Sequence, residues 1–174
     1  MSYGLVKFNN IETEARVKKF LFLAMLTASI HAFGQAAAPA LSNGQMLSLP
    51  IYSHIWYGDP GKEDTPRALL LSALVSIRNT DPGLPIRVTS AQYYDTSGNK
   101  LKQYLIAPIT IKPLGTHELF IPKSDSSGGS GANFLISWES AAPANAPMVE
   151  ALHAEVLGTR ALTFTTTARP VLAK

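Results

Sequence analysis

The chain has 174 residues, a formal net charge of +3 and no cysteine. The lack of cysteine excludes thiolate zinc sites, disulfides, thiol catalysis and an acylated lipoprotein anchor. Much of the positive excess lies before residue 35, and the rest of the chain has no run of like charge. It therefore carries no electrostatic footprint for nucleic acid and no polybasic membrane patch.

The N-terminal segment has the order of a secretory signal. Lys18 and Lys19 precede an apolar run, Phe20 to Leu26, and small residues follow up to Gly34. This order is typical of exported precursors, and the run is shorter than the ~20 residues of a membrane-spanning helix. We predict a leader over residues 1–36, with an apolar helical core at about 20–33, cleaved after Gly34 or Ala36. A buried core helix and an uncleaved inner-membrane anchor are the alternatives.

One domain, residues 49–174, is expected after a linker at 37–48. Met46 to Tyr57 is rich in Leu, Ile and aromatic residues, and its Pro50 indicates an edge strand or a strand with a break. A loop follows by composition at residues 58–66. Arg67 to Thr80 is predicted as a strand because alternate residues share an apolar face, namely Leu69, Leu71, Ala73, Val75 and Ile77.

The second half of the chain is also predicted to form strands. Ile86 to Tyr94 and Lys100 to Ile106 flank a turn in which Gly98 supplies the positive φ, as in a hairpin. Further short strands are expected at 109–112, 118–121, 133–139, 148–157 and 161–167. In 133–139, Phe134, Ile136 and Trp138 share one face, whereas Met148 to Leu157 also fits a helix.

Seven to nine short strands separated by turns predict an all-β fold, an antiparallel immunoglobulin-like β-sandwich.

Four segments together resemble a bacterial secreted family known only as domain of unknown function 3124. They are Ile51–Asp59, Ser76–Asp81, Tyr93–Gly98 and the glycine-rich Asp125–Phe134. The resemblance covers roughly Leu49 to Leu172. It implies a secreted location and the extent of the domain, but no chemistry.

Three histidines follow the leader, His54, His117 and His153, and they lie far apart in sequence. A folded site that gathers them would suit zinc or copper, but structural or surface roles are the more economical interpretation. Trp56 and Tyr57 beside His54 predict a polar-aromatic patch suited to ligand binding.

The glycine-rich loop is the other candidate site, with Asp125 and Asn133 as possible ligand contacts. It lacks the Lys-Ser/Thr and the helix of a phosphate-binding loop. Its single carboxylate is a poor match to a calcium loop. The favoured interpretation is a structural connection into the next strand, in which Gly128, Gly129 and Gly131 supply backbone freedom.

No catalytic signature is present: Gly129-Ser130-Gly131 is not a nucleophile elbow, and no carboxylate pair stands out. The sequence therefore predicts a periplasmic or secreted binding or accessory module, without catalysis or cofactor. Its expected partner is another extracytoplasmic protein or a cell-envelope component. Nucleic acid is not expected, nor is a membrane span once the signal is removed. A small metal-binding protein and an enzyme of unrecognised type are the alternatives.

Overall fold

The structure, a computed structural model, describes residues 40–60, 64 and 66–172. The predicted leader, its apolar core and both cleavage positions lie outside these residues. Among the described residues no helix has the length and apolarity needed to cross a membrane.

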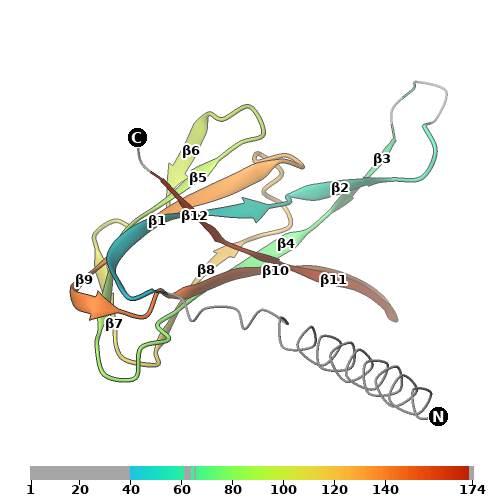
Figure 1. The fold of residues 1–174 in the computed structure, drawn as a ribbon. Helices are drawn as coiled ribbons and strands as arrows, with labels where there is room; N and C mark the ends of the chain where they lie inside the picture. Colours follow the sequence, from blue (N-terminus) through green and yellow to red (C-terminus); the bar gives the residue numbers. More distant parts are fainter. Residues whose placement is uncertain (1–39, 61–63, 65, 173–174) are drawn as a thin grey trace, which may run out of the picture. The chain divides into compact units, whose positions relative to one another are not determined.

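Two antiparallel sheets pack face to face, and a two-stranded ribbon projects from them (Figure 1). The larger sheet has the order β12-β1-β9-β5-β6, with β7 also paired to β5; the smaller has the order β11-β10-β4-β8; the ribbon pairs β2 with β3. The strands are β1 (Ser42–Ile51), β2 (His54–Tyr57), β3 (Arg67–Leu70), β4 (Ser72–Arg78), β5 (Ile86–Tyr94), β6 (Lys100–Gln103), β7 (Ile109–Ile111), β8 (Thr116–Ile121), β9 (Ala132–Ala144), β10 (Met148–Leu157), β11 (Arg160–Thr167) and β12 (Arg169–Val171). The all-β sandwich predicted from the sequence is thereby confirmed.

The core lies between the sheets and follows the period-two alternation of the strands. Leu49, Val75, Phe134 and Ile136 have no exposed surface, and Trp138 keeps only 3% of its surface exposed. These residues come from both sheets and belong to one buried cluster. The predicted inward face of 67–80 and that of 133–139 are therefore confirmed at these positions.

The structure has twelve described strands rather than seven to nine. Two expected strands are divided, since β1 and β2 are separated at Tyr52 and Ser53, and β3 and β4 at Leu71. The strand is broken as expected, but the break follows Pro50, which itself stays within β1 and pairs with Asn133. The third addition, β12, has only three residues and contains Pro170, so it gives no periodic signal.

The structure decides one element type that the sequence left open and corrects one strand boundary. Met148 to Leu157 is a strand and not a helix, because β4 and β11 pair with it on its two sides. β1 begins at Ser42, inside the expected linker 37–48, because Met46 pairs with Ser137 of β9 and with Val171 of β12.

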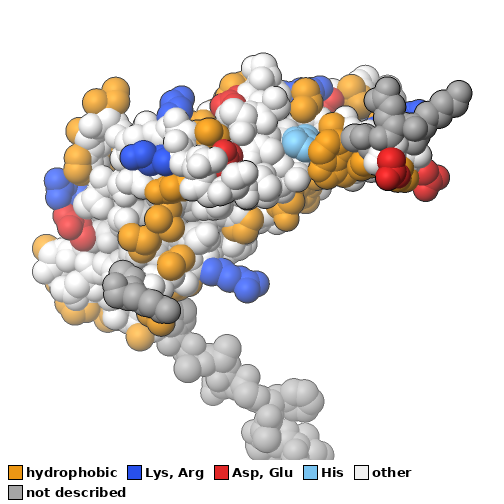
Figure 2. All heavy atoms as spheres, turned by 90° about the horizontal axis from the view of Figure 1, so that it is seen from above, with side chains coloured by type: hydrophobic (Ala, Val, Ile, Leu, Met, Phe, Trp, Pro, Cys, Tyr) orange, Lys and Arg blue, Asp and Glu red, His pale blue; other side chains and the backbone are white. Residues whose placement is uncertain are grey.

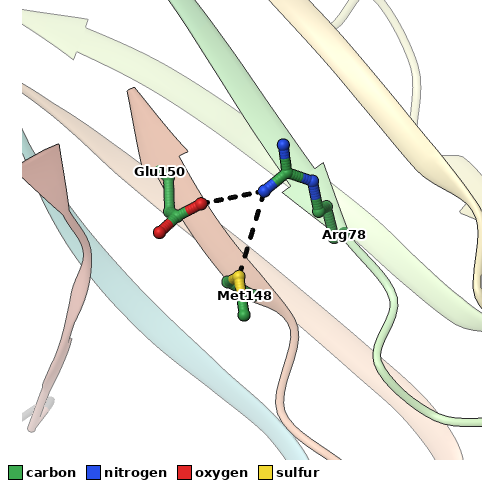
Figure 3. Close-up of polar contacts among 3 residues, drawn as sticks. All are labelled: Arg78, Met148 and Glu150. Atoms are coloured by element: carbon green, nitrogen blue, oxygen red, sulfur yellow. Dashed lines mark hydrogen bonds and ion pairs between the residues drawn. The ribbon is translucent and has the colours of Figure 1, made fainter. Parts of the chain in front are cut away.

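The outer face of the smaller sheet mixes apolar and charged side chains. Phe120, Leu74 and Leu152 lie side by side across β8, β4 and β10. At one end of the face, Arg78 Nη1 donates to Glu150 Oε2 at 2.8 Å and lies 3.9 Å from Met148 Sδ (Figure 3). An exposed ion pair of this kind stabilises the fold by at most about 1 kcal/mol.

Two buried polar side chains hold the turn after β4. The Asn79 amide donates to the carbonyls of Leu84, Ile111 and Lys112. Asp81 Oδ1 accepts from the backbone N–H groups of Gly83 and Leu84, and its Oδ2 accepts from Asn145 N at 3.0 Å. This carboxylate joins the turn to the start of the connection between β9 and β10.

Candidate binding site

The β2–β3 ribbon extends beyond the sandwich as a projecting arm (Figure 1). Its register places His54 opposite Leu70, Trp56 opposite Ala68, and Tyr57 opposite Arg67. Because side chains alternate across a strand, His54 and Trp56 share one face of the ribbon and Tyr57 lies on the other.

The ribbon exposes large aromatic side chains. Trp56 is 50% exposed and Tyr57 is 48% exposed. The rings of His54 and Trp56 meet edge to face at 4.7 Å between centroids. His54 Nε2 is buried and has no hydrogen-bond partner among the described residues. Figure 2 shows hydrophobic side chains and a histidine gathered over this arm. The predicted residues His54, Trp56 and Tyr57 therefore lie on one projecting element, but Tyr57 is on the opposite face from the other two and the expected single patch is divided.

The base of the ribbon is fixed to the sandwich through Ser53. Its hydroxyl lies 3.0 Å from Tyr93 Oη in a buried hydrogen bond, and its backbone N–H donates to Gly129 O at 3.0 Å. Its carbonyl accepts from Leu71 N at 2.9 Å. These three bonds connect β2, β3, β5 and the glycine-rich loop at one point.

Burial raises the pKa of the Tyr93 hydroxyl, the Ser53 hydrogen bond opposes this shift, and the charge of Asp125 adds to it. Burial likewise raises the pKa of Tyr104 to about 12, with the charge of Asp125 contributing. Both phenols therefore stay protonated at neutral pH, and Tyr93 remains a neutral hydrogen-bonding group beneath the loop.

The glycine-rich loop packs directly against β5 and the turn after it. A Cβ at Gly128 would collide with Tyr93 Oη and would lie 2.7 Å from Ala132 Cβ. Gly129 has a φ of +78°, and a Cβ there would lie 2.5 Å from Thr96 Oγ1. Thr96 Oγ1 donates to Gly128 O and accepts from Gly131 N at 2.9 Å.

The polar candidates of this loop point to local roles. Asp125 Oδ1 accepts from the N–H of Ser127 at 3.2 Å and from its hydroxyl at 2.5 Å. Asn133 lies in β9, paired with Pro50 of β1 and with Tyr94 of β5. The structure therefore places Asp125 and Asn133 in the loop and the following strand, and the ligand candidates of the ribbon on a different element.

His153 is fully buried in β10. Its ring stacks on Phe164 at 4.6 Å and meets Tyr52 edge to face at 5.7 Å, and its Nε2 accepts from Tyr52 N at 3.1 Å. Burial lowers its pKa, although backbone hydrogen bonds oppose the shift. His153 is therefore a neutral core histidine.

His117 lies in β8, opposite Ile77. It lines a shallow pocket of about 420 Å³ at the turn between β7 and β8. No group of three or more metal-ligating side chains occurs in the part of the chain that the structure describes. The three histidines are thus not gathered into one metal centre there.

Sequence reasoning missed the residues that connect the two candidate sites. Ser53, Tyr93 and Thr96 are ordinary strand and turn residues in sequence. The pairing of β9 with β1 brings Ser53 to the glycine-rich loop, and its pairing with β5 brings Tyr93 and Thr96 there. Three segments that carry the family resemblance, Ile51–Asp59, Tyr93–Gly98 and Asp125–Phe134, meet at this point. That shared resemblance is the one signal in the sequence that connected them.

These features define a β-sandwich protein with a projecting aromatic ribbon anchored beside a glycine-rich loop. The chain belongs to the family described as a protein of unknown function, DUF3124, whose profile matches residues 44–171. This confirms the resemblance seen in the sequence.

No curated protein matches the chain. Among solved structures, one titled "Crystal Structure of Thermotoga maritima 1070" is similar at 10% identity, covering 72% of this chain and 92% of that chain, with a TM-score of 0.39.

Proposed function

We propose that this protein is an extracytoplasmic protein-binding module whose contact surface is the β2–β3 ribbon. The observation that carries the proposal is the half-exposure of Trp56 and Tyr57 on a projecting element, with Arg67 paired across from Tyr57. Tryptophan, tyrosine and arginine are the residue types most enriched at the energetic centres of protein interfaces.

The anchoring of the ribbon supports this function. The bonds of Ser53 to Tyr93, Gly129 and Leu71 hold the base of the ribbon in one arrangement before a partner arrives. A preformed binding element loses less conformational entropy on association. The glycine-rich loop therefore supports the contact surface and does not itself bind the ligand.

The extracytoplasmic location rests on the order of basic, apolar and small residues from Lys18 to Gly34. The absence of cysteine is compatible with an oxidising compartment, since no thiol needs protection there. The partner is accordingly another exported protein or a protein component of the cell envelope.

We further propose that the sandwich is a variant of the immunoglobulin-like topology. Two of its pairings, β4 with β8 and β5 with β9, correspond to the B–E and C–F pairs of that fold. The outer strands differ, because β1 pairs with β9 and β10 pairs with β4, so the first and last strands of the common core exchange sheets.

The test of the binding function uses a photoreactive amino acid in place of Tyr57, in the exported protein within its own cells. We expect a discrete cross-linked adduct, and we expect Trp56→Ala in the same chain to abolish it. Phe120→Ala is the matched control, since Phe120 is an exposed aromatic on a different face, and it should leave the adduct unchanged.

The captured protein is then purified and its affinity is measured directly. Trp56→Ala should weaken binding at least tenfold, because a central interface tryptophan contributes about 2 kcal/mol or more. The melting temperature should not change, since the side chain is half-exposed. An absent adduct, or an adduct that survives Trp56→Ala, contradicts the proposal.

A further inference from the structure

The two sheets end in edge strands of very different character. At the edges of the larger sheet, β12 has three residues and includes Arg169 and Pro170, β7 also has three residues, and β6 has four with Lys100 and Lys102. Short length, lysine and proline are the devices by which proteins prevent unwanted strand pairing at an edge. The larger sheet is therefore protected at both edges.

The smaller sheet is protected at one edge only. Its edge strand β8 has six residues and carries His117 and Glu118. Its other edge strand, β11, has eight residues and no charge after Arg160. β11 also has no proline, and it pairs with β10 in an unbroken register from Arg160 to Thr167.

The composition of β11 favours further strand pairing. Residues 163–167 read Thr-Phe-Thr-Thr-Thr, and β-branched and aromatic residues are the best strand formers. No described strand pairs with the outer edge of β11, because the sheet order ends there, although Thr166 Oγ1 donates to Pro50 O of β1 at 2.7 Å. Figure 1 shows the strand at the margin of its sheet. A long, regular edge with no charge after its first residue is a template for another strand.

We infer that β11 pairs antiparallel with β11 of a second copy of this chain, about a two-fold axis at Thr163. This inference is independent of the proposed function, since it uses a different strand and a different sheet edge. The pairing joins two four-stranded sheets into one continuous sheet across the dimer.

The axis at Thr163 satisfies the geometry of an antiparallel pair. Residues directly opposite in such a pair lie on the same face of the sheet, so inward residues must meet inward residues. With Thr163 opposite its own copy, Leu162 faces Phe164, and both are inward-facing, since they pair with Glu155 and His153 of β10. Leu162, which is 39% exposed in the single chain, then gains an aromatic neighbour.

The charge distribution of β11 favours pairing with a second copy of the chain over pairing with an unrelated strand. In this register Arg160, the only charged residue of β11, lies opposite Thr166, so no like charges meet. Beyond Arg160 the edge has no charge that would recognise a differently charged partner, whereas two identical edges fit one another. The described strands offer one such edge per chain, so the assembly closes as a dimer.

The first test is the mass of the full exported protein in solution, measured by analytical ultracentrifugation over a range of concentrations. We expect a dimer. Thr163→Lys should be monomeric, because it places two lysines opposite each other at the axis. Thr116→Lys, an exposed threonine on the opposite edge strand of the same sheet, should remain dimeric. Thr116→Lys should melt like the wild type, and Thr163→Lys should do so at dilutions where the wild type is itself monomeric, because association adds to apparent stability.

The second test uses the absence of cysteine from the chain. Thr163→Cys should form a disulfide-linked dimer under mild oxidation, because the two side chains meet at the axis, whereas Thr116→Cys should not. A monomeric wild type, growth beyond the dimer, or a dimer that survives Thr163→Lys without the Thr163→Cys cross-link would each overturn the inference.

Discussion

Asp81 is the carboxylate that connects two distant parts of the chain. Its oxygens accept bonds from Gly83 and Leu84 in its own turn and from Asn145, which lies 64 positions further along the chain. The bond from Asn145 is the largest cause of its lowered pKa, the other two bonds add to it, and desolvation opposes the shift.

We predict that Asp81→Ala lowers the melting temperature more than Asp95→Ala does. Asp95 is the matched control, because its pKa is also lowered by hydrogen bonds, led by those from Asn99, but all of them lie within one hairpin turn. Thermal melts of both variants at neutral pH show which one has the lower melting temperature. Equal losses would show that the Asp81–Asn145 connection adds nothing to stability.

The same carboxylate gives a prediction for acid. Its folded pKa lies below its unfolded value, so its contribution is present above the unfolded pKa and is lost as pH falls through the folded pKa. The stability difference between wild type and Asp81→Ala should therefore shrink on acidification below the ordinary carboxyl pKa of about 3.9. Denaturant titrations at a series of pH values measure this difference.

The pKa of His153 makes stability depend on pH in a higher range than that of Asp81. Burial lowers its folded pKa, so the unfolded chain binds a proton that the folded chain does not, and stability falls as pH drops below about 6.5. Protonation of Nε2 would also break its bond from Tyr52 N.

We predict that His153→Phe has a flatter stability profile between pH 8 and pH 5 than the wild type, approximate limits set around the histidine pKa. At the upper limit it should be less stable by about 1–3 kcal/mol, because Tyr52 N–H loses its acceptor. Urea unfolding at each pH measures both effects. A parallel profile would mean that another group causes the acid sensitivity.

At the level of structural elements, the glycine-rich loop is fitted to its neighbours with little tolerance. We predict that Gly128→Ala destabilises the fold by about 1–3 kcal/mol, the usual range for an overpacked site, because the new methyl meets Tyr93 Oη and Ala132 Cβ. Gly131→Ala is the matched control. Its nearest contact is Thr96 Cγ2 at 3.1 Å, which a side-chain movement relieves. Chemical denaturation of both variants gives the order.

The same loop is expected to carry no ion. Asp125 is its one carboxylate and already accepts from Ser127, whereas a hard cation needs several anionic oxygens. Added calcium should leave the melting temperature of the wild type unchanged, and Asp125→Asn should shift it only slightly. A calcium-dependent rise that Asp125→Asn abolishes would make the loop a metal site.

The limits of prediction are clearest for these elements. Alternation of apolar residues located β4 and β9, because burial of one face imposes a period of two, and turn residues and composition located the other strands of the two sheets except β12. It could not locate the break at Leu71, which depends on a bond to Ser53 O. It also could not place Thr96 and Tyr93 beneath the loop, because residues distant in sequence meet only through strand pairing.

For the whole molecule, the core residue that tests the sandwich is Trp138. Its side chain lies between the sheets, and its Nε1 is buried without a hydrogen-bond partner among the described residues. We predict that Trp138→Ala costs roughly 3–5 kcal/mol, a large part of the stability of a domain.

Trp138→Phe should cost clearly less, since it keeps an aromatic ring and removes the unpaired N–H. Equilibrium unfolding in urea compares the two variants. In small domains, a loss of 1 kcal/mol in stability lowers the melting temperature by ~4–8 °C. If both variants melt within about a degree or two of the wild type, the assigned core is wrong.

The pairing of β1 with β12 has a kinetic consequence. Met46 meets Val171, so one of the first described residues of the sheet is paired with one of the last. Contacts that span so much of the chain must overcome the entropy of closing a long loop, and folds rich in them fold in milliseconds to seconds. The larger sheet cannot be completed while its C-terminal strand is still being synthesised. Under the extracytoplasmic location proposed above, this delay suits passage of the chain across a membrane in an extended form.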